Sequence, residues 1–256
     1  MKAFPLYEGT YSVDQSKKFI PFDPAVHSRS ERPGSLFISV QPFLIDTGKE
    51  LVLLDSGLGF TNQQDELILH QNIRNQGYDP ADVSKVLMSH LHVDHSSGMV
   101  QNRHGRYEPS FPQAEYYVQR EDFEHALLKP SKPAYRPMLE AMQRSGNLVL
   151  LEGSGSIDGT IHYELTGGHS EFHQVFRLES EEQTYFFGGD VLPEPEQLQR
   201  RFIAKYDFDG RKSMELREKF GLKAASEGWI CLFYHSDTFA AGKVRHENDA
   251  FLIDPA

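Results

Sequence analysis

The chain has 256 residues, with 26 Lys and Arg against 37 Asp and Glu, which gives a formal charge of −11. Its hydrophobic content of 39% is enough for a substantial core and excludes a disordered chain. The single cysteine excludes a disulfide framework and any site of several thiolates, so a bound metal would need imidazole and carboxylate ligands. The acidic balance argues against nucleic acid as a partner, because that surface needs clustered Lys and Arg.

No apolar run approaches the roughly 20 residues that a membrane span requires, and the first residues lack the apolar core of a signal peptide. We therefore expect no membrane partner and a cytoplasmic location. No repeat, low-complexity tract or linker divides the sequence, so we expect a single domain over residues 1–256.

Strand and helix patterns alternate through the first part of the chain. Residues 36–46 and 50–55 are strand-like and flank a Thr47-Gly48-Lys49 turn, which predicts a hairpin. A sparse apolar face predicts a helix over 62–76, and a short strand is expected at 85–89. This alternation favours an α/β sandwich over an all-β barrel.

The middle of the chain is rich in proline, with five of the 14 prolines between Pro109 and Pro137. A strand is expected at 114–119, followed by helices at 120–128 and 134–145. Two interpretations stay open for this segment. It is either a helical layer whose boundaries are set by proline, or a lid over a site.

The second half returns to strand patterns, with one long helix expected over 211–226. The inner face of that helix is predicted to carry Met214, Leu216, Phe220 and Ala224. Two β-rich halves that each carry helices predict two sheets packed face to face with helices outside. The strands are expected at 148–151, 161–165, 172–178, 184–188 and 229–233.

Histidine is the unusual residue of this sequence, with 12 in total and three within the run His90-Leu91-His92-Val93-Asp94-His95. On a strand, His90 and His92 would point to the same face, so both imidazoles could reach one cation. The chain would then turn, and Asp94 and His95 could address a second position nearby. Imidazole suits Zn, Fe or Ni, and a carboxylate also tolerates Mn.

A metal site needs more ligands than this run offers, and three later residues have a suitable setting. His169, Asp190 and His235 each follow a predicted strand. Glycines before His169 and Asp190 permit a tight approach of the backbone. Each residue alone could be an ordinary core or surface residue, and their shared position at strand ends is what indicates a common site.

The run from His90 to His95, followed by His169, Asp190 and His235, resembles the metallo-β-lactamase superfamily, whose signature is HxHxDH and then His, Asp and His in that order. Leu54-Asp55-Ser56-Gly57 is similar to the strand-ending acidic turn of that family. The resemblance spans roughly residues 36–236. A weaker one, in Tyr206-Asp207-Phe208-Asp209 and the helix that follows, is to the subgroup containing lactonases and organophosphate hydrolases.

The resemblance implies an α/β fold of the αββα type, a four-layer sandwich of two mixed sheets flanked by helices, with two divalent metal ions at one edge. Zinc is the default ion, and Mn, Fe, Co or Ni are also accepted by such ligands. Asp55 would orient a ligand imidazole. The implied ligands are His90, His92 and His169 for the first metal, Asp94, His95 and His235 for the second, and Asp190 as the bridge.

The implied activity is hydrolysis of a small-molecule ester, most readily a lactone or related carboxylic ester. Two metal ions roughly 3.5–4 Å apart can share a hydroxide that attacks the substrate, and Asp94 could also carry a proton to the leaving group. One lactonase subgroup has a tyrosine shortly after the bridging aspartate, where this chain has Val191-Leu192-Pro193. Tyr206 or Tyr234 would have to supply a phenol instead.

Other functions stay open on the same fold. A phosphotriesterase or phosphodiesterase, including a nuclease, is one alternative, although the negative charge disfavours nucleic acid. An iron redox enzyme with one metal ion is another, although the full second set of Asp94, His95 and His235 counts against it. A non-enzymatic metal-stabilised scaffold is the third. A homodimer is also an open possibility for the assembly.

Overall fold

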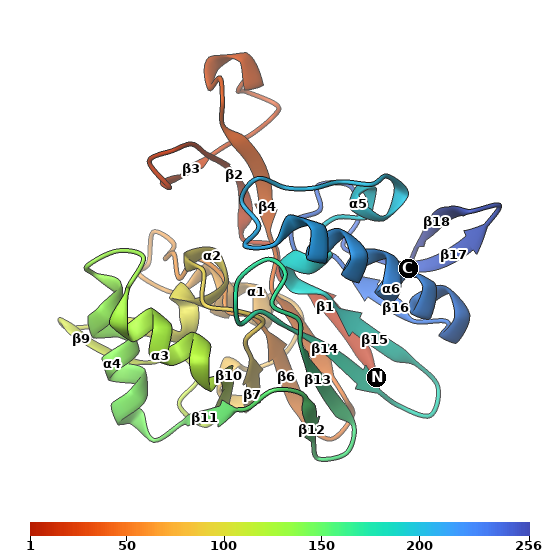
Figure 1. Cartoon of the computed structure of the whole chain (residues 1–256). Coiled ribbons are helices and arrows are strands. Elements are labelled where there is room, and N and C mark those ends of the chain that lie inside the picture. The colour runs from red at the N-terminus through yellow and green to blue at the C-terminus, as the bar shows by residue number, and fades with distance from the viewer.

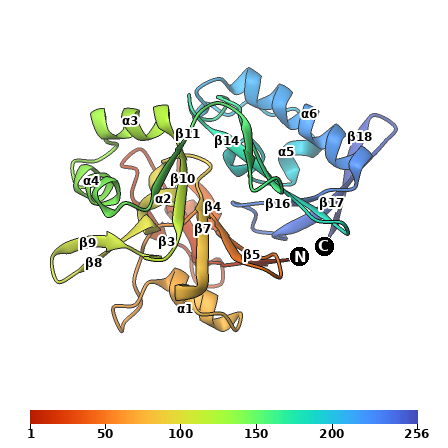
Figure 2. The same ribbon diagram turned by 90° about the horizontal axis from the view of Figure 1, so that it is seen from below.

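Two β-sheets lie face to face in the computed structural model, and helices cover the outer side of each (Figure 1). The structure describes residues 1–256. Seen from below, α3 and α4 lie on one side of the paired sheets and α6 on the other (Figure 2). This arrangement confirms the predicted αββα sandwich.

The first sheet has six strands in the order β1-β5-β6-β7-β10-β11. It is mixed, because β1, β5 and β6 pair antiparallel while β6, β7, β10 and β11 pair parallel. The predicted hairpin around Thr47-Gly48-Lys49 is confirmed as β5 and β6. The strands are β1 (Lys2–Pro5), β5 (Phe43–Asp46), β6 (Leu51–Leu54), β7 (Val83–Leu87), β10 (Glu115–Gln119) and β11 (Leu148–Leu151).

The second sheet has seven strands in sequence order, and only β15 and β16 pair parallel. The long helix α6 lies between these two strands in the chain and provides their crossover. The strands are β12 (Gly155–Ile157), β13 (Ile161–Leu165), β14 (Gln174–Glu179), β15 (Thr184–Phe187), β16 (Ile230–Leu232), β17 (Ala241–Glu247) and β18 (Ala250–Pro255).

Helices cover the outer faces of both sheets, and none of them combines the length and apolarity needed to cross a membrane. The Pro-rich middle segment forms a helical layer, since α3 and α4 contribute Phe123, Tyr135 and Leu139 to the core against the first sheet. The helices are α1 (Ile68–Asn75), α2 (Val93–Ser96), α3 (Arg120–Leu128), α4 (Tyr135–Ser145), α5 (Glu196–Gln199) and α6 (Gly210–Glu227), with 3-10 turns η1 (Arg29–Glu31), η2 (Pro80–Asp82), η3 (Ser97–Met99) and η4 (Gly189–Val191).

Three buried apolar clusters hold the layers together. One lies between the two sheets and includes Phe43, Leu54, Leu87, Phe176 and Phe187. A second packs α1, α3 and α4 on the first sheet, and a third packs α5 and α6 on the second. Burial of this much apolar surface fixes the spacing of the sheets and therefore the edge at which their loops meet.

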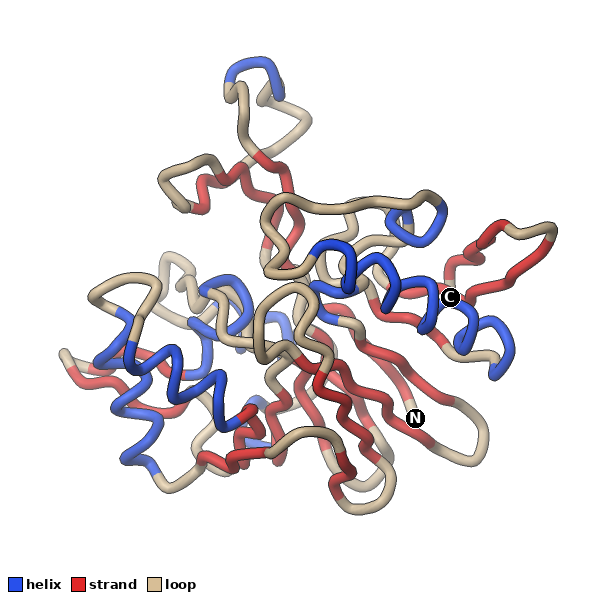
Figure 3. The backbone as a smooth tube through the Cα atoms, viewed as in Figure 1, coloured by secondary structure: helices blue, strands red, loops and turns tan.

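Two small sheets complete the fold (Figure 3). The three-stranded sheet of β2 (Gly9–Val13), β3 (Phe19–Pro21) and β4 (Leu36–Val40) belongs to an arm that projects from the body, as Figures 1 and 3 show. The other pairs β8 (Val100–Arg103) with β9 (Arg106–Pro109). Of these strands, only β4 lies within a predicted one, the strand expected over 36–46.

Two predicted elements differ from those observed. The strand expected over 36–46 is interrupted at Gln41 and Pro42, and its two parts, β4 and β5, pair in different sheets. The helix expected over 62–76 is shorter, because the Asn62 side chain accepts hydrogen bonds from the backbone N–H groups of Gln64 and Glu66 and forms a turn there. Hydrogen bonds from backbone N–H groups to a nearby side chain compete with the backbone hydrogen bonds of a helix.

Candidate metal centre

The His-rich run follows β7 and lies at the edge where the two sheets meet. The strand expected at 85–89 is β7 (Val83–Leu87), which ends two residues earlier, so His90 and His92 follow it in a loop and do not share a strand face. The short helix α2 then begins at Val93 and turns Asp94 and His95 back toward the same edge. The loop brings both imidazoles to one point.

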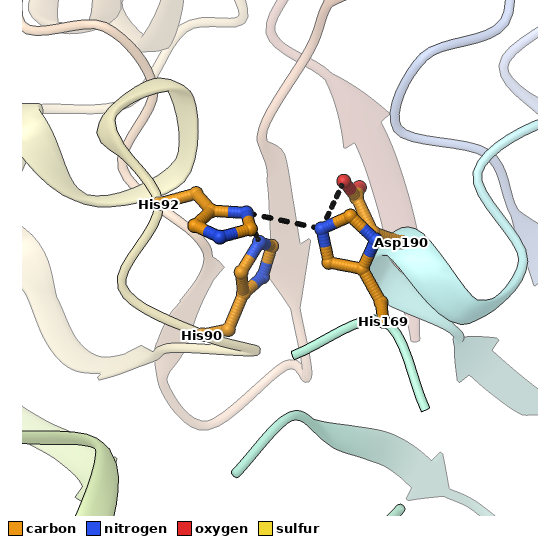
Figure 4. A group of neighbouring side chains, drawn as sticks. All are labelled: His90, His92, His169 and Asp190. Atoms are coloured by element: carbon orange, nitrogen blue, oxygen red, sulfur yellow. Dashed lines mark hydrogen bonds and ion pairs between the residues drawn. The ribbon is translucent and has the colours of Figure 1, made fainter. Parts of the chain in front are cut away.

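One group of possible ligands combines that loop with residues from the second sheet (Figure 4). Nδ1 of His92 lies 2.9 Å from Nε2 of His90 and 3.0 Å from Nε2 of His169. Oδ2 of Asp190 lies 3.1 Å from the same Nε2 of His169. Three ring nitrogens and a carboxylate oxygen therefore converge on one small volume.

The second group consists of Asp94, His95 and His235. Oδ2 of Asp94 lies 3.8 Å from Nε2 of His95 and 3.6 Å from Nε2 of His235. Oδ1 of Asp190 lies 3.1 and 3.2 Å from the same two nitrogens. The two oxygens of Asp190 thus face different groups.

Asp55 determines which nitrogen carries the proton in two of these imidazoles. Its Oδ2 lies 2.7 Å from Nδ1 of His95 and also accepts a hydrogen bond from the Ser89 hydroxyl at 2.6 Å. The Ser89 oxygen lies 3.0 Å from Nδ1 of His90, and because its own proton goes to Asp55, it accepts there. Burial raises the pKa of Asp55, against the opposing effect of the His95 imidazole and the Ser89 donors. With this carboxylate as the acceptor, Nδ1 of both rings carries a proton and Nε2 faces inward.

Two further imidazoles are held in the same way. Nδ1 of His169 lies 2.9 Å from Oδ1 of Asp207, and Nδ1 of His235 lies 2.7 Å from the backbone oxygen of Ser39. Both partners accept, so Nε2 of each ring is again the free lone pair. Four Nε2 atoms therefore point into two adjacent positions, where each can take up a proton or a metal cation.

Buried polar atoms without partners point to the same conclusion. Nε2 of His95 and Oδ1 of Asp190 are inaccessible to solvent and have no hydrogen-bond partner. A buried unsatisfied polar atom costs about 1–3 kcal/mol. These two atoms lie 3.1 Å apart without the alignment of a hydrogen bond, which suits a position between them and a cation. The donor set contains imidazole nitrogens and carboxylate oxygens only, and this set fits zinc and the neighbouring divalent ions.

Charges within the cluster shift the titration of its members. Burial alone would raise the pKa of Asp190, but the imidazoles of His95, His235 and His169 hold it well below its usual range. Burial opposes protonation of His95, yet the carboxylates of Asp190, Asp94 and Asp55 raise its pKa well above the ordinary value. The carboxylates thus create a strongly negative position that favours positive charge between the sheets.

Two residues of this centre were not predicted from the sequence. His173 is fully buried, and its Nε2 accepts the backbone N–H of Asp190 at 3.1 Å while Nδ1 contacts the Thr166 hydroxyl at 2.9 Å. Asp207 was noted only within a motif. Neither could be identified from spacing, because both act by contacts between distant segments, although the position of Asp207 in the Tyr206–Asp209 motif was a usable signal.

An open pocket of about 390 Å³ leads to the first group. Tyr206 lines this pocket, and its ring centroid lies 5.9 Å from that of His169. Larger hollows of about 560 and 950 Å³ lie elsewhere and contain none of the seven residues. The wall residues beyond His90, His92 and His169 are Leu91, Asp122, His125, Ala126, Lys129, Ser131, Tyr135, Ser170, Glu171, Phe172, Tyr206 and Phe208.

The two candidate phenols have different surroundings. Tyr234 is fully buried, stacks on His95 with ring centroids 4.1 Å apart, and donates its hydroxyl to the backbone oxygen of Asp94 at 2.7 Å. Tyr206 is about half exposed at the pocket wall. Burial and then the carboxylate of Asp190 raise the pKa of Tyr206 to about 12, which keeps its hydroxyl protonated and able to donate.

The model of a known protein family, the metallo-beta-lactamase superfamily, matches residues 37–235. A curated relative, an N-acyl homoserine lactonase of Bacillus thuringiensis, is 25% identical over 172 residues, which is 59% of this chain and 62% of the relative. The chain thus spans about three fifths of the length of this relative.

Solved structures share the fold over nearly the whole chain. A probable metal-dependent hydrolase from Staphylococcus aureus has a TM-score of 0.78 and 20% identity, covering 100% of this chain and 96% of its own. AidC, a dizinc quorum-quenching lactonase in complex with a product, has a TM-score of 0.74 and 19% identity, covering 99% and 94%. At such identities the likeness concerns the fold.

Proposed function

The chain belongs to the metallo-beta-lactamase superfamily, and on that premise we propose that it is a metal-dependent hydrolase with two divalent ions, zinc by default. The single observation that carries the proposal is the position of Asp190. Its two oxygens face His169 on one side and His95 with His235 on the other. A full second group beside the first argues against a redox enzyme with one iron.

Seven side chains of this chain would hold the ions. A pair of divalent ions, when bound, lowers the pKa of a water molecule and polarises the substrate bond that is attacked. Asp55, Ser89, Asp207 and the backbone of Ser39 hold the Nδ1 side of four imidazoles, so that Nε2 of each is already oriented toward the ions. The seven are His90, His92 and His169, then Asp94, His95 and His235, and Asp190 between them.

Asp94 is the proposed proton carrier. It lies at the beginning of α2, and the side chain is 13% exposed while Oδ2 faces His235 and His95. A carboxylate with one oxygen toward the ions and some access to solvent can take a proton from the attacking water and deliver it to the leaving group. Tyr206, at the pocket wall, would donate a hydrogen bond to the substrate oxygen.

The proposed substrate is a small carboxylic ester, with a lactone as the first candidate. The pocket is small and open, and its wall includes the aromatic rings of Phe172, Tyr206 and Phe208 beside the possible ligands. Such a wall suits a compact substrate with an apolar portion. The lactonase activity named for the Bacillus thuringiensis relative supports the same choice.

The test combines metal analysis with a substrate panel. Protein purified without added metal is expected to contain about two divalent ions per chain and to hydrolyse lactones or simple esters faster than phosphotriesters. Asp190→Asn should lose metal and turnover, whereas Glu181→Gln, which changes an exposed carboxylate, should lose neither. One ion of iron, or turnover that survives removal of metal, would overturn the proposal.

A further inference from the structure

A buried guanidinium lies beneath the first group of ligands. Arg217 on α6 is only 2% exposed, and each of its three nitrogens donates a hydrogen bond within the protein. Nε donates to the backbone oxygen of Val191 at 2.7 Å, Nη1 to that of Phe202 at 2.6 Å, and Nη2 to Oδ2 of Asp207 at 3.3 Å.

The predicted inner face of α6 was apolar. The observed one includes Ser213 and Arg217, because the helix packs on polar backbone at this end.

Asp207 connects this guanidinium to His169. Its side chain has no exposed surface, and while Oδ2 accepts from Arg217, Oδ1 lies 2.9 Å from Nδ1 of His169. The backbone follows the same contact, since Phe208 N–H donates to the oxygen of His169 at 2.8 Å and Asp209 N–H to that of Gly168 at 2.9 Å. The loop carrying His169 is therefore fixed to the beginning of α6.

The contact with Val191 reaches a second ligand. Val191 follows Asp190 directly and ends the 3-10 turn that carries it. One guanidinium thus supports Asp190 through the backbone and His169 through Asp207. The imidazoles of the second group have no such connection to α6, since His95 and His235 are held by Asp55 and by the backbone of Ser39. Only Asp190, which faces both groups, is shared.

We propose that Asp207 and Arg217 are positioning residues that set the metal affinity of the first group, His90, His92, His169 and Asp190. This inference rests on the proposed function, because it requires that the group binds a metal. The Asp207 carboxylate makes Nε2 of His169 a stronger electron-pair donor to a metal ion. The Arg217 guanidinium compensates the buried charge of Asp207 and orients its carboxylate. Loss of an outer carboxylate of this kind typically weakens metal binding 10- to 100-fold.

The chosen variants separate charge from shape. Asp207→Asn keeps the size and one acceptor but removes the negative charge. Arg217→Lys keeps the positive charge, but a single ammonium lacks the planar fork that serves three separate acceptors. Glu218→Gln is the matched control, because Glu218 lies next to Arg217 on α6 with its side chain 54% exposed.

Two variants that each lack one possible ligand allow the metal affinity of each group to be measured by itself. His235→Ala leaves only the first group complete, and His92→Ala leaves only the second. Zinc affinity of metal-stripped protein is measured by competition with a chromophoric chelator. We expect Asp207→Asn to weaken zinc binding 10- to 100-fold in the His235→Ala background and less than threefold in the His92→Ala background. Because Arg217 also supports Asp190, which faces both groups, Arg217→Lys should weaken zinc binding in both backgrounds and more strongly in His235→Ala. Glu218→Gln should have no effect in either.

The outcomes distinguish this inference from the proposed function. If neither background binds zinc and wild-type protein contains none, the proposed function fails. If zinc binds but Asp207→Asn weakens both groups equally, or neither, the positioning role is overturned. Circular dichroism of the metal-free variants reports whether each one folds, and Arg217→Lys provides the comparison should Asp207→Asn not fold.

Discussion

Asp55 and His95 are 40 residues apart in the chain, yet Oδ2 of Asp55 lies 2.7 Å from Nδ1 of His95, and neither side chain has exposed surface. Asp55 adopts a left-handed backbone conformation with φ of 56°. That conformation costs a non-glycine residue roughly 1–2 kcal/mol. The strain and the contact occur together at the end of β6, which indicates that the turn is built to present this carboxylate.

Replacing Asp55 should therefore affect both stability and metal binding. Asp55→Ala leaves the Ser89 N–H and hydroxyl and the His95 ring without their acceptor, and we expect a loss of about 3–5 kcal/mol in the free energy of unfolding. Asp55→Asn, which tolerates the same backbone conformation, should lose less. Urea unfolding and metal analysis test this, and equal stability of Asp55→Ala and wild type would contradict it.

Glu8 gives the protein a pH-dependent stability. Burial raises the pKa of this carboxyl to about 8, although the backbone N–H of Leu58 donates to it. Between about pH 4.5 and 8 the folded state therefore holds a proton that the unfolded state has released. Stability should fall with rising pH across this window by up to about 1.4 kcal/mol per pH unit.

Glu8→Gln isolates that effect, because the amide keeps an acceptor for Leu58 N–H and does not titrate. The variant should gain stability relative to wild type as the pH increases from 5 to 8. Denaturant unfolding of both proteins at several pH values, under identical metal conditions, measures the difference. A difference that does not change with pH would show that Glu8 is not protonated in the folded state.

Gly98 has no room for a side chain. A Cβ there would lie 1.9 Å from the backbone oxygen of Ser56, in the turn that carries Asp55. We expect Gly98→Ala to cost about 3 kcal/mol or more, because backbone must move. Gly105→Ala is the control, because its Cβ would meet nothing within 4 Å. It should lose only the roughly 1–2 kcal/mol in the free energy of unfolding that a left-handed φ of +82° costs a non-glycine residue. Thermal unfolding should rank the two variants in this order.

The two tyrosines should respond differently to loss of the hydroxyl. Tyr234→Phe should lower stability by about 1–3 kcal/mol, since the Asp94 oxygen loses its donor, while kcat/KM changes less than threefold. Tyr206→Phe should leave stability intact and lower kcat/KM about tenfold, the value of one hydrogen bond near 1.4 kcal/mol. Equal kinetic effects in both variants would refute the role proposed for Tyr206.

Much of the fold could be predicted from local patterns. Helix α3 and strands β11 and β13 match the predicted bounds, since their apolar periodicity and the flanking Pro and Gly act within a few residues. Strands β2, β3, β8 and β9 were missed, because they are only three to five residues long and carry little periodic signal. The break at Gln41 and Pro42 in the strand expected over 36–46 was also missed. It depends on tertiary pairing, because β4 joins the small sheet of the arm and β5 joins the first large sheet.

The sequence by itself determined the chemistry available to this protein: one cysteine, an acidic charge, and seven His and Asp residues in the order of a known motif. Those features depend on residue type and spacing, which a sequence states directly. Only the tertiary structure decided how Asp190 divides its oxygens between two groups and how Arg217 reaches Asp207 and Val191. Such contacts join segments that meet only when the sheets pack, and no local pattern encodes them.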